Sequence, residues 1–304
     1  MADVKGKRER DAIMDVIEKR SLRFRFMKHD SWENALFVHW PVEPSILAAL
    51  LPRGLEPDLQ EGVAWLGLVL LTERGVSGHG RLPRSVVAPI DHYGANVRTY
   101  VRHEGVPGIY FFSLECTSIA ASLGARLAGI PYFPARMWRR VDIEQPLGVG
   151  GGKLGCLQRA APPLAIPENP QDSGSLGEKA SRTGFRFEFS SVRLGGRASV
   201  TAAWRLEDEL LAAKEQQCFE ERARFFVERY SVYASWPAGR GPVLLRGDVT
   251  HPPWQVVRAS LEHLDAESLL AAAGFGGVAA AAAKPHVAFS RGVGPIEFWM
   301  LEPV

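Results

Sequence analysis

Runs of apolar and β-branched residues divide much of the chain into strand-length segments. Residues 96–102 (NVRTYVR) and 108–118 (GIYFFSLECTS) are rich in β-forming residues, and the turn-prone HEGVP separates them. Residues 184–206 repeat this arrangement around Gly195-Gly196, which predicts a hairpin with a two-residue turn. The run GVAWLGLVLL at 62–71 predicts a further strand.

Helical periodicity is confined to shorter parts of the chain. It predicts helices at 8–20, after Pro44 as far as Pro52, at 118–129 before a glycine stop, and over most of 209–233. Residues 145–184 are rich in glycine and proline and predict an irregular segment. Residues 243–249 and 256–264 predict a strand pair around THPPW, and 286–301 would complete the sheet. The alanine-rich residues 271–285 predict a low-complexity surface stretch.

Strands therefore dominate, and hairpins outnumber any strand–helix–strand unit. This pattern predicts a mainly β (α+β) fold, with one curved antiparallel sheet that is closed or nearly closed and a few helices at its rim. Neither an internal repeat nor a Pro/Ser linker divides the chain. We expect an N-terminal helical extension over residues 1–30 and a single domain over 31–304.

Composition narrows the class of protein without naming a function. The chain has 304 residues, 46% hydrophobic and 23% charged, with a formal net charge of +2, so no global field favours nucleic acid or an anionic membrane. No run reaches the ~20 apolar residues that span a bilayer, and no secretory signal is evident. The three widely separated cysteines, Cys116, Cys156 and Cys218, are typical of reduced thiols, so a cytoplasmic location is expected.

The first hairpin contains the first candidate binding residues. Side chains alternate along a strand, so Arg98 and Tyr100 share one face. If the loop that connects the two strands has an even number of residues, Ser113 and Glu115 lie on the same face as Arg98. If the number is odd, they lie on the opposite face. An Arg98–Glu115 pair inside a closed sheet would indicate a polar cavity, because buried ion pairs contribute little stability. The alternative is that this face is solvated.

The order of several short motifs points to a known family. The segments HWPV, LLPRGLEPD, NVRTYV, GIPYFPARM and RGDVTHPPW, from about His39 to about Trp299, resemble the YqjF-like family of uncharacterised conserved proteins. That family is similar in fold to acetoacetate decarboxylase. The resemblance implies a curved, cone-like antiparallel β-barrel with a ligand cavity, but a shared fold does not by itself imply a shared function.

The chain departs from the decarboxylase at the residues that carry its chemistry. In that enzyme two adjacent lysines follow a glycine–apolar–proline turn, and one of them forms a Schiff base. In GIPYFPAR (129–136) those places hold Tyr132 and Phe133, neither of which can form an imine. The resemblance also places Arg98 where the decarboxylase keeps a glutamate. Of the eight lysines only Lys28 falls on a predicted strand, so Schiff-base chemistry is not expected.

A second candidate site lies in RGDVTHPPW. Asp248 could orient His251 as a general base or anion ligand before the rigid Pro-Pro-Trp that ends at Trp254. The alternative is an ordinary turn in which Asp248 accepts backbone N–H groups. No histidine, cysteine and carboxylate spacing predicts a metal site, and neither a phosphate loop nor a dinucleotide fingerprint predicts a cofactor.

These observations favour a barrel protein that binds a small organic, anionic ligand without a cofactor. Its ligand-binding candidates are Arg98, Tyr100, Ser113, Tyr132, Arg136 and Trp254. One alternative is a lyase, isomerase or hydrolase that uses Tyr132, Glu115 or Asp248 with His251. Another is a non-catalytic partner-binding protein. An edge strand could also pair across a homo-oligomer.

Overall fold

The fold is a highly curved sheet with helices at its margins. The computed structural model describes residues 25–78, 89–127, 129–144, 184–206, 213–238, 241–278 and 284–304. Its strands are β1 (Arg25–His29), β2 (Ser31–Val42), β3 (Glu56–Pro57), β4 (Ala64–Gly78), β5 (Ile90–His103), β6 (Val106–Cys116), β7 (Tyr132–Glu144), β8 (Gly184–Arg193), β9 (Ser199–Leu206), β10 (Ser231–Ala238), β11 (Gly241–Thr250), β12 (Val257–Asp265), β13 (His286–Val293), β14 (Ile296–Trp299) and β15 (Glu302–Pro303). Its helices are α2 (Pro44–Leu50), α3 (Ile119–Leu127), α4 (Ala213–Val227) and α5 (Glu267–Ala272).

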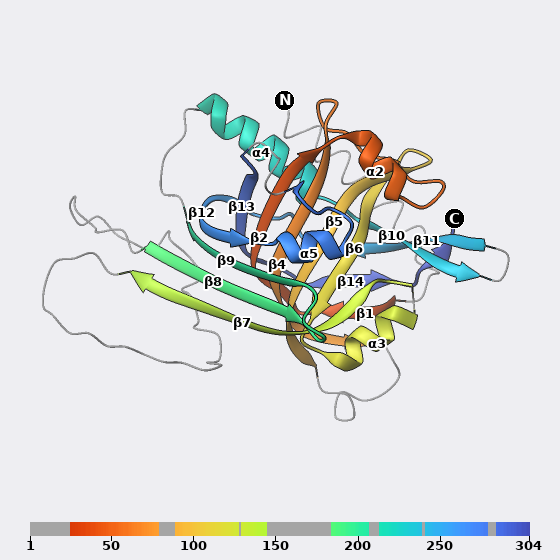
Figure 1. Cartoon of the computed structure of the whole chain (residues 1–304), viewed down its shortest axis with the longest axis horizontal. Coiled ribbons are helices and arrows are strands. Elements are labelled where there is room, and N and C mark those ends of the chain that lie inside the picture. The colour runs from red at the N-terminus through yellow and green to blue at the C-terminus, as the bar shows by residue number, and fades with distance from the viewer. Residues whose placement is uncertain are drawn as a thin grey trace, which may run out of the picture.

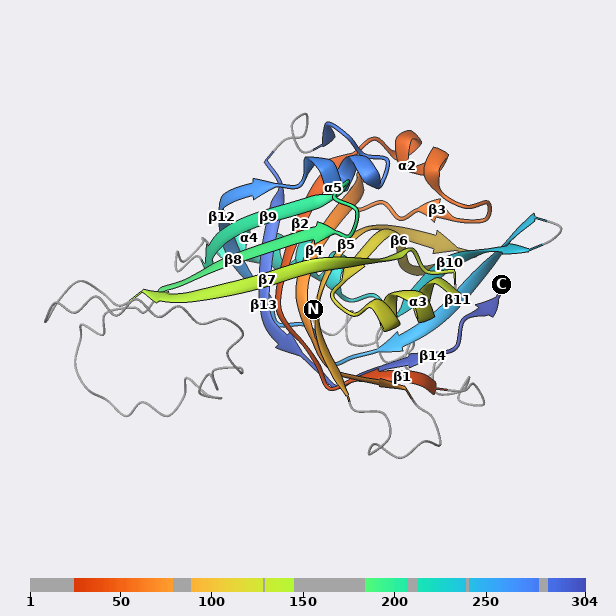
Figure 2. The ribbon, with the colours of Figure 1, turned by 60° about the horizontal axis from the view of Figure 1, so that its bottom comes forward.

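Strand pairing closes the sheet twice. The larger ring runs β2-β4-β5-β6-β7-β8-β9-β12-β13 and returns to β2. The smaller ring runs β4-β5-β6-β10-β11-β14-β1 and returns to β4. Both rings share β4, β5 and β6, so each of these three strands presents one face to each ring. Figure 2 shows β8, β9 and β12 on one side and β10, β11, β14 and β1 on the other.

The two faces of the shared strands differ in character. Leu66, Leu68, Ala95 and Val97 face the larger ring, where they join its main apolar core. The opposite face carries Val69, Leu71 and Tyr100, which pack with Phe226 at the C-terminal end of α4. Side chains on this second face therefore lie in the smaller ring or under α4.

The sequence predicted many of the elements but not all of their pairings. The mainly β class, the hairpin β5–β6, the strand β4 and the helices α2 and α3 are confirmed. The helix α4 ends at Val227, and residues 231–233, predicted as its last turn, instead begin β10. The strands β11 and β12 do not pair with each other: β11 joins β10 and β14, whereas β12 joins β9 and β13.

Two local expectations were also wrong. Five residues, 194–198, connect the paired ends of β8 and β9 where a two-residue turn was predicted, although Gly195 and Gly196 both have positive φ. Phe275, in the predicted low-complexity surface stretch, is 2% exposed and packs edge-on against Phe112. The predicted helix at 8–20 and residues 145–183 lie outside the described residues. The division at residue 30 stays a prediction, but residues 25–29 already form β1 in the sheet.

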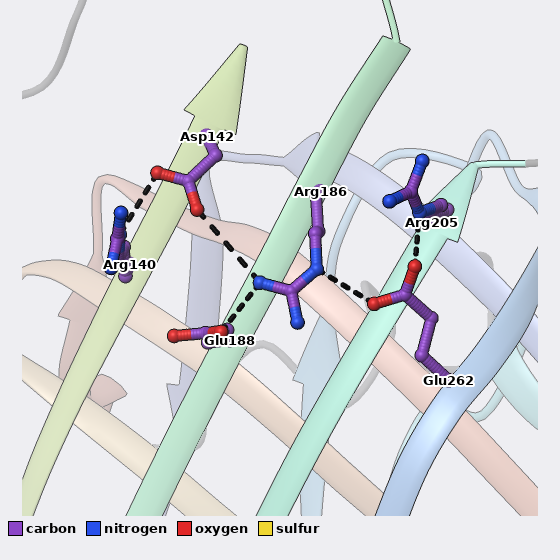
Figure 3. Close-up of polar contacts among 6 residues, drawn as sticks. All are labelled: Arg140, Asp142, Arg186, Glu188, Arg205 and Glu262. Atoms are coloured by element: carbon purple, nitrogen blue, oxygen red, sulfur yellow. Dashed lines mark hydrogen bonds and ion pairs between the residues drawn. The ribbon is translucent and has the colours of Figure 1, made fainter. Parts of the chain in front are cut away.

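The outer face of the larger ring is solvated and charged. Beside the far ends of β7 and β8, which extend beyond the rest of the sheet in Figure 1, acidic and basic side chains alternate across neighbouring strands. Figure 3 shows this network, which comprises Arg140, Asp142, Arg186, Glu188, Arg205 and Glu262. Partly exposed pairs of this kind contribute little stability each.

Candidate functional site

The candidate site is the polar strip on the second face of β5, where Arg98 lies. Arg98 is 8% exposed. Its Nε donates to the Tyr100 hydroxyl at 3.3 Å, and its Nη2 donates to the Phe226 carbonyl at 3.1 Å. Its guanidinium carbon lies 5.7 Å from the centre of the Phe37 ring and 5.6 Å from that of Tyr100. Among the described residues it forms no ion pair with a carboxylate.

Neutral and aromatic groups surround this guanidinium. The Nε2 atom of His39 lies 2.6 Å from the Tyr100 hydroxyl, and its ring stacks on Phe226 with centroids 3.8 Å apart. Burial, helped by electrostatic repulsion from His286 and from Arg98, holds the pKa of His39 well below its usual value. His39 is therefore neutral at physiological pH, and Arg98 remains the fixed positive charge of the strip.

Trp254 lies on the far side of Phe37 from Arg98, and its role as a ligand-binding residue stays a prediction. Its ring meets Phe37 edge-on at 5.2 Å and stacks on Trp32 at 5.8 Å. His251 also lies here, 6.0 Å from Trp254, and Arg98 is among the charges that lower its pKa, after burial itself. The fold thus brings the segment with His251 and Trp254 close to the strand with Arg98 and Tyr100, although the two lie about 150 residues apart in the sequence.

The predicted Asp248–His251 pair is not what holds the imidazole. Asp248 accepts hydrogen bonds from Arg246 at 3.1 Å and from Ser231 at 3.2 Å. The His251 ring nitrogens lie 2.8 Å from the Pro252 carbonyl and 3.4 Å from the Arg229 carbonyl. Backbone carbonyls therefore orient His251, because the strand β11 turns the Asp248 carboxylate toward its neighbour on β10.

Ser113 and Glu115 lie on the opposite face from Arg98. The ladder pairs Arg98 with Phe111 but Val97 with Ser113, so Phe112 is an extra residue, a β-bulge that reverses the alternation. Glu115 instead bonds Arg193, whose Nε lies 3.0 Å from Oε1, and Ser113 accepts from Arg193 Nη2 at 2.7 Å. Burial raises the pKa of Glu115, with Arg193 opposing it. The expected Arg98–Glu115 pair was wrong.

Tyr132 and Arg136, from the same motif, have different surroundings. Tyr132 pairs with Leu114, which pairs with Asn96, so Tyr132 shares the face of Arg98. Its side chain is partly exposed, yet burial and the negative charge of Glu73 raise the pKa of its hydroxyl well above the usual value. Arg136 pairs with Val192 and is exposed on the outside of the sheet, so it does not point inward.

A buried acid–imidazole cluster on this face was missed by sequence reasoning. Glu73, His29 and His92 are 7%, 2% and 6% exposed. The Glu73 carboxylate lies 3.1 Å from His29 Nδ1 and 3.5 Å from His92 Nε2. In the sequence, the only sign of this cluster is a single glutamate that follows the apolar run of β4. The two histidines lie on β1 and β5, so no local spacing links them to that glutamate. Within the described ranges no set of three potential ligands could hold a metal ion.

Comparisons with known proteins place the chain in a family. Residues 29–294 match the family DUF2071, described as "Uncharacterized conserved protein". The chain belongs to this family. A curated relative, "Uncharacterized protein YqjF" of Bacillus subtilis (strain 168), is 41% identical over 115 residues, which are 37% of this chain and 46% of the relative. The matched region thus spans about half the length of that relative.

Solved structures similar to this family member share its fold at low identity. One is the enduracididine biosynthesis enzyme MppR with HEPES bound, with a TM-score of 0.53, 14% identity, and coverage of 93% of this chain and 88% of that one. Another is acetoacetate decarboxylase from Legionella pneumophila, with a TM-score of 0.51, 12% identity, and coverage of 93% and 88%. The acetoacetate decarboxylase-like fold is therefore confirmed. No helix in the described part of the chain is long and apolar enough to cross a membrane.

Proposed function

We propose that the protein binds a small organic anion, with its carboxylate against the guanidinium of Arg98. The observation that carries this proposal is a buried arginine without an acidic partner. Among the described residues, the two other arginines with 8% or less of their surface exposed do have one: Arg229 lies 2.5 Å from Asp58, and Arg246 lies 3.0 Å from Asp248. Burying an unpaired charge is costly, so a bound carboxylate would compensate it.

The contacts of Arg98 leave it able to bind such a ligand. Nε and Nη2 are engaged, whereas Nη1 donates to no described residue. A guanidinium presents a planar set of donors that suits a carboxylate. Phe37, Tyr100 and Trp254 supply flat apolar surface beside it, which favours an organic anion over an inorganic one.

In this proposal the ligand does not form an imine at position 132 or 133, because Tyr132 and Phe133 have no side-chain amine. Of the lysines in the described ranges, Lys28 lies 3.5 Å from Asp30, and Lys214 and Lys284 are exposed. A solved structure of MppR is described as complexed with pyruvate. We extend that ligand class, a small carboxylate, to this chain. The predicted cytoplasmic location and homo-oligomer stay predictions.

A thermal-shift screen of small carboxylic acids, pyruvate included, tests the proposal. A ligand at a hundred times its Kd should add about 2.7 kcal/mol of apparent stability to the wild type. Arg98→Met should abolish the shift, and Arg98→Lys should weaken it because the planar donor set is lost. Arg136→Met is the matched control, since Arg136 is exposed, and should keep the full shift.

Two outcomes would overturn the proposal. One is a shift of equal size in Arg98→Met and in the wild type, because the ligand would then bind elsewhere. The other is no shift with any carboxylate, which would favour the partner-binding alternative. Arg98→Met itself should fold, because the substitution removes a buried charge that has no acidic partner among the described residues.

A further inference from the structure

One edge of β7 has no strand beside it for most of its length. β6 pairs with β7 only from Tyr132 to Pro134, whereas β8 pairs with it from Ala135 to Glu144. No other described strand pairs with β7, so among the described residues the side of 135–144 that faces away from β8 is a free edge. The far ends of β7 and β8 extend beyond the rest of the described sheet (Figure 1), so no other described strand lies alongside the free edge there.

Two hydrogen bonds show which backbone groups point out of this free edge. Leu194 N donates to the Pro134 carbonyl, and Leu114 N donates to the Pro131 carbonyl, each at 2.9 Å. The carbonyls of even-numbered residues of β7 therefore face β8, and those of odd-numbered residues face the other way. The pairing with β8 has no bulge, so this alternation continues along the strand. The odd-numbered residues of the free edge consequently present N–H and C=O groups that a further strand could bond.

The charges on the free edge are complementary to those of a second, antiparallel copy. Arg140 and Asp142 lie on the outer face, in the network of Figure 3, and flank Val141, which is 42% exposed. When Val141 of two copies lie opposite each other, Arg140 of each copy lies opposite Asp142 of the other. Val141 is odd-numbered, so the two central residues exchange backbone hydrogen bonds. The flanking charges then occupy the non-hydrogen-bonded pairs, where side chains are closest.

Neighbouring registers do not have this complementarity. A two-fold axis at Arg139 or at Arg140 would place two arginines directly opposite each other, and an axis at Asp142 would do the same with two acids. Charged side chains usually protect an exposed edge from pairing, but the order Arg-Val-Asp favours one register of self-pairing. Because the β7–β8 ribbon extends away from the rest of the sheet (Figure 1), the rings of the two copies would lie at opposite ends of a sheet ordered β8-β7-β7-β8.

We propose that the free edge of β7 is a homodimer interface in which two copies of the chain pair antiparallel about Val141. The partner is a second copy because the charge order of this edge is complementary to itself, and a two-fold axis is the commonest symmetry of soluble oligomers. Arg140 already lies 2.8 Å from Asp142 of its own strand, so pairing adds interstrand contacts without burying an uncompensated charge. The interface contains no residue of the Arg98 strip, so this inference does not depend on the proposed anion binding.

Cysteine crosslinking tests the pairing and its register. Residues at a hydrogen-bonded antiparallel pair have Cα atoms about 5.5 Å apart, which a disulfide can span. With Cys156 and Cys218 replaced by serine, Val141→Cys should form a covalent dimer under mild oxidation. Val192→Cys is the matched control, since Val192 is also 42% exposed but lies on β8, and it should remain monomeric on a denaturing gel. Equal crosslinking of the two variants, including none in either, would overturn the proposed pairing.

Charge variants test the same register without a new cysteine. The wild type should sediment as a dimer in equilibrium with monomer over a range of concentrations. Arg140→Asp alone, or Asp142→Arg alone, opposes like charges and should raise the dimer dissociation constant by about tenfold or more. An equimolar mixture of these two variants should recover the dimer, because each then meets the opposite charge. Arg205→Asp, in the same exposed network but on β9, should sediment like the wild type.

A proline at the centre tests the backbone bonds. Val141→Pro removes an N–H that points out of the free edge and leaves the bonds to β8 in place, so the variant should fold and be monomeric. If it does not fold, the charge variants decide, because their substitutions lie on the exposed outer face. A wild type that is monomeric at every concentration would overturn the proposal and indicate another occupant of the edge. A dimer that Val141→Pro and both charge variants leave intact would also overturn it, because the interface would then lie elsewhere.

Discussion

At the scale of single residues, neutral histidines define the charge of the Arg98 strip. His286 stacks on Phe219 with ring centroids 5.0 Å apart and lies 6.2 Å from His39. Burial, and then the positive charge of Arg222, lower the pKa of His286 to about 4. Both imidazoles therefore remain uncharged near neutral pH, which leaves Arg98 as the cation that an acidic ligand would meet.

This arrangement predicts a loss of stability in acid. The folded pKa of His286 is below its unfolded value of about 6.5, so the unfolded state binds the proton first. Stability should be full above pH 6.5 and fall as the pH drops toward 4, by about 3 kcal/mol from this residue. His286→Phe keeps the stacking and should reduce that fall in urea unfolding between pH 7 and 4.5.

His263→Phe is the control for this measurement. His263 is exposed, so the variant should follow the wild-type pH dependence. The argument fails if His286→Phe and the wild type lose equal stability on acidification.

At the scale of elements, β6 is the strand that joins the two rings. It pairs in parallel with β10 at Ile109 and Tyr110 and in parallel with β7 from Leu114 to Cys116. The bulge at Phe112 lies between these two pairings and turns Glu115 into the larger ring. This one extra residue therefore places Glu115 on the face opposite Arg98, where it bonds Arg193 instead.

The junction of β6 with β10 has no room for a side chain at Gly108. A Cβ there would lie 2.6 Å from the Tyr233 ring and 2.7 Å from the Ser231 carbonyl oxygen. We expect Gly108→Ala to cost about 1–3 kcal/mol in urea unfolding, because overpacking displaces the neighbouring strand. Gly276→Ala is the control, since its nearest contact would be an ordinary 3.5 Å, and it should be nearly neutral. Equal effects of the two substitutions would contradict this explanation.

At the scale of the whole molecule, a buried ion pair fixes the end of α4 over the sheet. Arg229 follows α4, lies 2.5 Å from Asp58 and places its guanidinium carbon 4.1 Å from the centre of the Phe225 ring. Asp58 is 3% exposed, and it also lies 2.6 Å from Arg102. The segment before β4 is thereby tied to the connection between α4 and β10, which covers the Arg98 strip.

Two acids should therefore differ sharply in their contribution to stability. Asp58→Asn leaves a buried guanidinium uncompensated and should cost about 3–5 kcal/mol. Glu262→Gln removes a partly exposed acid from the network in Figure 3 and should cost about 0–1 kcal/mol. Urea unfolding of both variants checks the contrast, and similar values for the two would show that burial is not the deciding factor.

The sequence by itself determined the strand-forming segments, the hairpin β5–β6, the side-by-side placement of Arg98 and Tyr100, and the replacement of lysine by Tyr132. These follow from local preferences and from alternation within one strand. Only the tertiary structure decided that Phe112 forms a β-bulge, that β11 and β12 do not pair with each other, and that the Glu73 carboxylate lies close to His29 and His92. Register and partner choice depend on packing between segments distant in the chain, and a shift of one residue exchanges the two faces of a strand.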